Sequence, residues 1–278
     1  GGAPPLDLSR QMAVLDCELA IHVGAIAYDD GSKADFTLRH VGVYSRVFDA
    51  VPFYPTVGNH DVRADEGFSY DAAFLWQAPY PGVRYYAFRW GSILFVSIDT
   101  SSKTEDVRGL RDGDGRQLEW LERTLEHASS DPDVRWIVTF MHHPVYSHAI
   151  GISGHEPDRN IRRTLGPLFE RYGVDLVTAG HDHHYERTVP VLDGKRVEPG
   201  CGPVHLLSGG GGASRYARDV RPSPLLAFGQ RVYHFVDLRI DSSRIHGRVI
   251  GRDGEVIDEF TVRPFAGETA GLEARCEK

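Results

Sequence analysis

Histidine is abundant in this chain and concentrated in one part of it. Seven of the 14 histidines fall within 43 residues, where an even spread would place about two. Histidine is the commonest metal ligand and the side chain whose ordinary pKa lies nearest neutral pH. The pattern predicts a metal or proton-transfer site formed by some of these seven: His142, His143, His148, His155, His181, His183 and His184.

Polar segments that could form such a site share one placement, because each follows directly after a predicted strand. The strands and the segments after them are residues 17–23 and 24–28, 51–57 and 58–61, 134–141 and 142–144, and 174–179 and 180–184. Ligands bind at the carboxyl ends of strands in α/β sheets, so we expect the four segments to meet at one rim. His181 and His183 are two residues apart, so both rings face the same side of an extended backbone. The N and O donors of this rim suit Zn²⁺, Fe or Mn²⁺, and they are Asn59, His60, His142, His181 and His183.

The same segments carry a family pattern. They read Gly24-Ala25-Ile26-Ala27-Tyr28, Gly58-Asn59-His60-Asp61, Phe140-Met141-His142-His143-Pro144 and Gly180-His181-Asp182-His183, followed by Tyr185-Glu186-Arg187. In type and order they resemble the calcineurin-like metallophosphoesterase superfamily, and within it the purple acid phosphatase-like branch. The resemblance implies an α/β fold, a two-sheet αββα sandwich of the metallophosphoesterase type. It also implies a phosphatase that hydrolyses phosphomonoesters or phosphodiesters.

The resemblance assigns roles to individual residues. It implies that Asn59, His142 and His181 hold one metal ion, while Tyr28 and His183 belong to a second. The family pairs Fe with Zn, Mn or Fe, and a hydroxide bridging the two ions attacks phosphorus. His60 would lie beside the phosphate and protonate the leaving group or stabilise the transition state. The substrate would be a small phosphorylated molecule, and an extracytoplasmic location, periplasmic or secreted, is expected.

Two departures from the family pattern concern the carboxylates. Position 25 is alanine, where the family has an aspartate that bridges both metal ions. The family's first motif, D-x-G, is absent from the sequence, and we expect the strand that carries it to be missing. Two divalent ions ~3.5 Å apart repel by roughly 20 kcal/mol at an effective dielectric constant of ~20, so anionic ligands must offset that repulsion. We therefore expect this chain to bind one metal ion or none and to hydrolyse phosphoesters poorly. An engineered and a natural origin of Ala25 both stay open.

Further polar residues next to the expected ligands have two readings each. His148 lies in the Gly/Ser-containing loop 147–154 and His155 directly follows it; the two histidines either bind substrate or belong to a solvated loop. His143 and His184 either point away from the site or support the ligands from behind. Asp61 and Asp182 could orient ligand imidazoles.

Composition and periodicity place these motifs in a soluble-type mixed α/β chain. Hydrophobic residues make up 41% and charged residues 25%, and the net charge of −8 disfavours a nucleic-acid scaffold. No apolar run is long enough to span a membrane, and residues 1–5 do not read as a signal peptide. Three cysteines allow at most one disulfide.

We expect one catalytic domain over residues 1–263 and a tail over 264–278. Expected helices cover 36–50, 115–128 and 161–172, and an antiparallel meander covers 232–240, 244–250 and 256–262.

Two other functional classes compete with a phosphoesterase. A catalytically inactive relative could bind phosphorylated ligands or act as a scaffold. A metallo-β-lactamase-type hydrolase is rejected, because residues 181–186 lack the Asp-His end of its H-x-H-x-D-H motif. The sequence leaves the substrate, the metal identity and the oligomeric state open.

Overall fold

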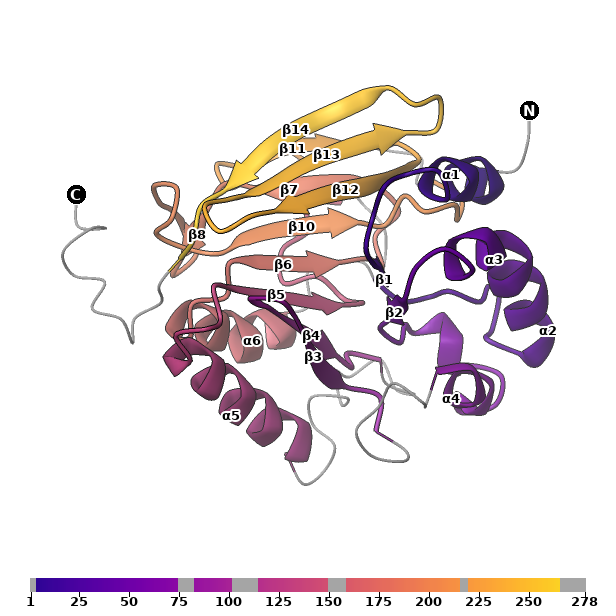
Figure 1. Cartoon of the computed structure of the whole chain (residues 1–278), viewed down its shortest axis with the longest axis horizontal. Coiled ribbons are helices and arrows are strands. Elements are labelled where there is room, and N and C mark those ends of the chain that lie inside the picture. The colour runs from indigo at the N-terminus through magenta and orange to yellow at the C-terminus, as the bar shows by residue number, and fades with distance from the viewer. Residues whose placement is uncertain (1–3, 75–82, 102–114, 150–158, 216–219, 266–278) are drawn as a thin grey trace.

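The structure is a computed structural model that describes residues 4–74, 83–101, 115–149, 159–215 and 220–265. A seven-stranded sheet lies at its centre, in the order β11-β7-β10-β6-β5-β4-β3 (Figure 1). Strands β4, β5, β6 and β10 are parallel, and antiparallel strands extend the sheet at both edges. The strands are β3 Tyr86–Trp90, β4 Ile93–Ile98, β5 Trp136–Met141, β6 Leu176–Ala179, β7 Tyr185–Thr188, β10 Val204–Ser208 and β11 Leu226–Gln230.

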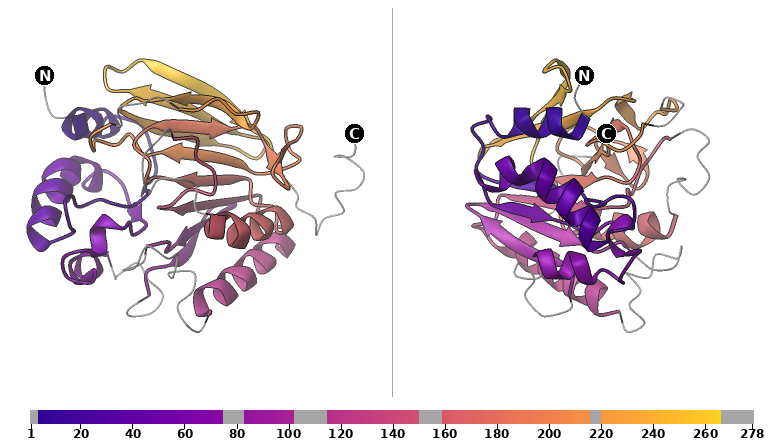
Figure 2. Two further views of the ribbon diagram at one scale, coloured as in Figure 1. Left: turned by 180° about the vertical axis from the view of Figure 1, so that it is seen from behind. Right: turned by 90° about the vertical axis from the view of Figure 1, so that its right-hand side faces the viewer.

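Both faces of this sheet are covered, which explains its continuous apolar strands. Every residue of β5 is buried, as expected for a central parallel strand. One face packs against the helices α5 (Arg116–Ser130) and α6 (Arg159–Arg171), which are seen in front of the sheet in the left view of Figure 2. Leu121, Leu125 and Leu165 are fully buried there.

The opposite face packs against an antiparallel three-stranded meander. Its strands are β12 (His234–Ile240), β13 (Ile245–Gly251) and β14 (Val256–Val262). Ile245 and Val249 of β13 share a buried cluster with Trp136 and Phe140 of β5. Two sheets therefore pack face to face. A short β8–β9 hairpin, Val191–Leu192 with Lys195–Arg196, lies near the start of β10.

The N-terminal part of the chain covers the end of the sheet at which the parallel strands finish, as the right view of Figure 2 shows. It contains α1 (Pro4–Met12), a parallel pair of short strands, β1 (Ala20–His22) and β2 (Phe53–Pro55), and several helical segments. These segments are α2 Lys33–Asp35, a π-helical stretch Phe36–Val41, α3 Gly42–Phe48, a 3₁₀ turn His60–Val62 and α4 Phe68–Phe74.

The predicted α/β class and two-sheet packing are confirmed, while element boundaries differ. Predicted strands 17–23 and 51–57 shrink to three residues each. Pro52 and Pro55 lack the backbone N–H that a longer ladder needs, and Gly24 turns the chain with a φ of 84°. The helix predicted over 36–50 begins earlier, at Lys33, and contains the π-helical stretch.

The predicted tail begins with a buried residue. Phe265 is 4% exposed, and its backbone N–H donates to buried Asp175. Residues 266–278 lie outside the described part of the chain.

The cysteines differ in state: Cys201 is disulfide-bonded and Cys17 is a free thiol. Within the described residues, the helices are too short or too polar to cross a bilayer.

Candidate metal centre

Four loops meet where strands β1, β2, β5 and β6 end, as the sequence predicts. In Figure 1 the arrowheads of β5 and β6 point toward β1 and β2. Close backbone contacts join the loops: Gly180 N–H donates to the His142 carbonyl at 3.0 Å. Gly24 and Gly58 pack so tightly that a Cβ on either glycine would meet the other loop's backbone. Small residues are therefore needed for the rim to close.

His142 is oriented so that one ring nitrogen faces the other candidate ligands. Its Nδ1 lies 2.8 Å from the Val23 carbonyl, which only accepts, so Nδ1 carries the proton. Burial, followed by the neighbouring His143, lowers the pKa of His142 well below its ordinary value, so the ring is neutral. Its Nε2 is then a lone pair, 2.9 Å from Asn59 Oδ1 and 3.2 Å from His181 Nδ1. A lone pair held against an amide oxygen is stabilised by a cation between them, so this donor set fits a metal ion.

His143 joins this group. The ligand atoms of His142, His143 and His181 all lie within 4.8 Å of one another. The sequence left His143 either facing away or supporting the ligands from behind, because adjacent residues of a strand point to opposite sides. Strand β5, however, ends at Met141. Both histidines lie in the bend beyond it, where the alternation no longer applies.

Tyr28 and His183 lie in contact, as predicted, and are hydrogen-bonded to each other. His183 Nδ1 lies 2.7 Å from the Ser214 carbonyl and therefore carries a proton. Its Nε2 accepts from the Tyr28 hydroxyl at 3.0 Å. Burial, with a smaller contribution from Asp61, raises the pKa of Tyr28 to about 12, so the phenol keeps its proton. This half of the site has two neutral donors.

Ala25 belongs to the rim loop 24–28 and is 8% exposed, with a φ of 53°. Its methyl group offers no donor atom for a metal ion. The residues present therefore fit one ion beside Asn59, His142 and His181, and do not fit a bridged pair.

His60 lies against Tyr28, with ring centroids 4.1 Å apart. Its Nδ1 is 2.6 Å from the Asp29 carbonyl, so Nδ1 donates, and the Arg63 guanidinium lies beside the ring. Burial lowers the pKa of His60, the hydrogen bond to Asp29 opposes that effect, and Arg63 adds to it. The predicted role of His60 beside the phosphate stays a prediction.

The two aspartates of the motifs contact the rim loops. Asp61 accepts from the backbone N–H groups of Ile26, Ala27 and Gly58 at 2.8, 3.0 and 2.8 Å, and so ties two rim loops together. Asp182 accepts from the Ser147 hydroxyl. That either aspartate orients a ligand imidazole stays a prediction.

His148 and His184 both contact Glu186, which sequence reasoning quoted only as part of a motif. The Glu186 carboxylate is 1% exposed and accepts from the His148 backbone N–H at 2.8 Å, from the His148 ring and from His184 Nε2 at 3.1 Å. Burial alone would raise the pKa of Glu186, but hydrogen bonds from both histidines lower it. The substrate role proposed for His148 stays a prediction, and His155 lies outside the described residues.

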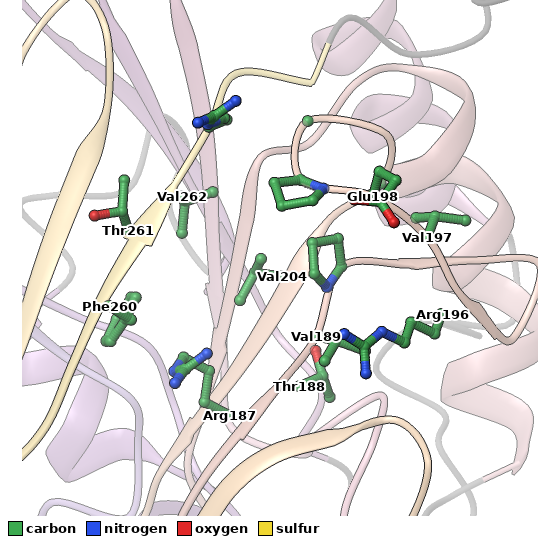
Figure 3. A pocket seen from close by; sticks show the side chains of 15 residues that line it. Arg187, Thr188, Val189, Arg196, Val197, Glu198, Val204, Phe260, Thr261 and Val262 are labelled. Atoms are coloured by element: carbon green, nitrogen blue, oxygen red, sulfur yellow. The ribbon is translucent and has the colours of Figure 1, made fainter. Parts of the chain in front are cut away.

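A cavity of about 220 Å³ lies away from this centre, at the opposite end of the sheet (Figure 3). It is formed where β7 ends and β10 begins, beside β14. Arg187 in its wall is already paired with Asp258, at 2.8 Å. Because none of the rim histidines lines the cavity, we assign the chemistry to the rim.

Fold and site together are those of a metallophosphoesterase. The family model for calcineurin-like phosphoesterases matches residues 16–185, and the chain belongs to this family, in its purple acid phosphatase-like branch.

Relatives of this chain include human acid phosphatase type 7, which is 30% identical over 95% of this chain and 65% of its own length. An uncharacterised protein of Mycobacterium tuberculosis is 33% identical over 59% of this chain and 36% of its own length. The chain thus spans about one third to two thirds of these curated relatives. A purple acid phosphatase from yellow lupin seeds has the same fold, with a TM-score of 0.81 at 24% identity over 95% of this chain and 50% of that one.

Proposed function

We propose that this chain is a metal-dependent phosphoesterase that holds a single divalent ion and, with alanine at position 25, turns over phosphoesters slowly. The observation that carries the proposal is the contrast between the two halves of the rim. Asn59 Oδ1 and His181 Nδ1 lie 2.9 and 3.2 Å from His142 Nε2, while Tyr28 and His183 are hydrogen-bonded to each other.

Each half of the rim has a role in this proposal. An ion held by Asn59, His142 and His181 would supply Lewis-acid polarisation of a phosphoryl oxygen. Protonated His60 would hold another oxygen of the phosphoryl group or give its proton to the departing alcohol. The Tyr28–His183 pair is neutral and therefore does not offset the negative charge on the other phosphoryl oxygens. Turnover is for this reason expected to be slow.

A small phosphorylated molecule is the proposed substrate. An extracytoplasmic location is proposed from the family resemblance and from the disulfide at Cys201, since structural disulfides persist mainly in oxidising compartments.

Restoring the missing carboxylate tests the function. Ala25→Asp is expected to raise kcat/KM for a chromogenic phosphomonoester at least about tenfold, because it adds an anionic donor between the half-sites. Position 25 has a left-handed backbone, which aspartate and asparagine tolerate better than alanine. Ala25→Asn is therefore the matched control, with the same shape and no charge. Equal activity of the two variants would contradict the proposal.

The alternative is a relative that binds phosphorylated ligands without hydrolysing them. The hydrogen bond between Tyr28 and His183 favours it, because that pair is complete without a metal ion. In that case Ala25→Asp would leave the chain inactive, while a phosphate ester would still bind to the wild-type protein with measurable affinity.

A further inference from the structure

We propose that His143 is a ligand of the metal centre, so that His142, His143 and His181, with the amide oxygen of Asn59, hold one divalent cation of the zinc type. The inference rests on the proposed function only in placing a metal ion at the same rim. It assigns to His143 a role that neither the motif pattern nor the resemblance gives it.

The three rings are grouped as a shared ion requires. The His143 ring centroid lies 4.3 Å from that of His181 and 5.0 Å from that of His142. The His142 and His181 centroids are 5.1 Å apart. One ligand atom from each ring falls within 4.8 Å of the other two. Zinc binds imidazole nitrogens at ~2.0–2.1 Å, so a modest contraction would bring all three onto one ion.

The surroundings of His143 fix its ring as they fix the rings of metal ligands elsewhere. The hydroxyl of Thr100 lies 3.1 Å from His143 Nδ1, and it accepts from the His143 backbone N–H at 3.0 Å. Thr100 is only 2% exposed and follows the end of β4. When Nδ1 donates to this hydroxyl, Nε2 is the atom that presents a lone pair. His142 is held in the same manner by the Val23 carbonyl.

The backbone at His181 gives a second, independent observation. His181 has a φ of 70°, a left-handed conformation that is uncommon outside glycine. Such a conformation is unfavourable for a residue with a side chain and persists where the surrounding structure holds it. Here the turn directs the His181 ring toward both other rings, whose centroids lie 4.3 and 5.1 Å away.

His143 also explains how one ion can be held without the bridging carboxylate. Two imidazoles and an amide oxygen make a weak three-donor set. A third imidazole completes four neutral donors, a number and type that suit Zn²⁺. The Tyr28–His183 half of the rim takes no part in this site.

The test compares one histidine from each half of the rim. Metal-free full-length protein is titrated with Zn²⁺ by calorimetry as wild type, His143→Ala and His183→Ala. We expect His143→Ala to weaken binding at least about tenfold and His183→Ala to change it by less than about threefold. Melting curves of the metal-free variants check folding. Should His143→Ala fail to fold, His143→Gln, which keeps a polar group near Thr100, is expected to show the same loss.

Zinc X-ray absorption on the wild-type complex provides a readout independent of affinity. If the outer-shell scattering shows three imidazole ligands around the zinc ion, the inference is supported. If it shows two, the inference is overturned. Unchanged zinc affinity in the His143 variants, or an equal loss in His183→Ala, also overturns it. If zinc binds through His143 but Ala25→Asp stays inactive, the phosphoesterase proposal fails while this one stands.

Discussion

Asn59 Oδ1 lies 2.9 Å from Nε2 of His142. The Val23 carbonyl fixes the orientation of the His142 ring by accepting a hydrogen bond from its other ring nitrogen, Nδ1. In the other part of the rim, where alanine stands at position 25, Tyr28 and His183 are hydrogen-bonded to each other.

The packing of the rim makes one stability prediction. A Cβ at Gly58 would collide with the Ala25 backbone nitrogen, so Gly58→Ala should lower the free energy of unfolding by at least about 2 kcal/mol. Gly42→Ala is the matched control. Gly42 begins helix α3 with helical backbone angles, and an added Cβ would lie 3.5 Å from the Thr37 carbonyl, an ordinary contact, so alanine there should raise stability by up to roughly 0.5–1 kcal/mol. Urea denaturation measures both, and equal effects would show that the rim tolerates a wider spacing.

Glu186 supplies a pH-dependent prediction. Its folded-state pKa lies below the ordinary 4.5 because both histidines hydrogen-bond the carboxylate, although burial opposes this. The stability that the Glu186 carboxylate contributes is therefore fully present above pH 4.5. It is lost as the pH falls through the lower pKa that Glu186 has in the folded state. Glu186→Gln should cost about 1–3 kcal/mol at pH 7, and progressively less as the pH falls below 4.5. A difference in unfolding free energy that is independent of pH would refute this account.

His60 predicts how anion binding varies with pH. Burial holds the pKa of His60 below 6.5, so its ring is neutral at pH 7.5 and becomes charged as the pH falls. Binding of sulfate, which stays dianionic, should strengthen as the pH falls below 6.5, by up to roughly tenfold once the ring is charged and a charge-assisted hydrogen bond forms. His60→Ala should flatten this dependence, as measured by competition with a chromogenic phosphomonoester. An unaltered slope in that variant would remove His60 from the binding site.

Much of this site could be predicted from the sequence because its ligands follow strand ends. The carboxyl ends of strands gather at one rim whatever the exact strand lengths, so Asn59, His142 and His181 were placed together even though β1 and β2 are shorter than expected. The Tyr28–His183 pairing came from the family motif, and the structure confirms only that the two residues meet.

What the sequence could not supply was the direction of side chains beyond a strand end. His143 adjoins a ligand, and strand alternation points it away, yet the bend after Met141 turns it into the group. Asp61 carries no signal that separates an imidazole partner from backbone partners, because its contacts with Ile26 and Ala27 are 35 and 34 residues distant in the chain. The contacts of Glu186 could not be predicted for the same reason, since its partner His148 is 38 residues distant in the chain.

The number of metal ions that one chain retains distinguishes a single-ion site from a bridged pair. Wild-type protein is saturated with Zn²⁺ or with Fe and Zn²⁺, dialysed, and analysed by inductively coupled plasma mass spectrometry, with Ala25→Asp treated in parallel. We expect one retained ion in the wild type and two in Ala25→Asp. Two tightly retained ions in the wild type would show that the rim holds a pair without the aspartate.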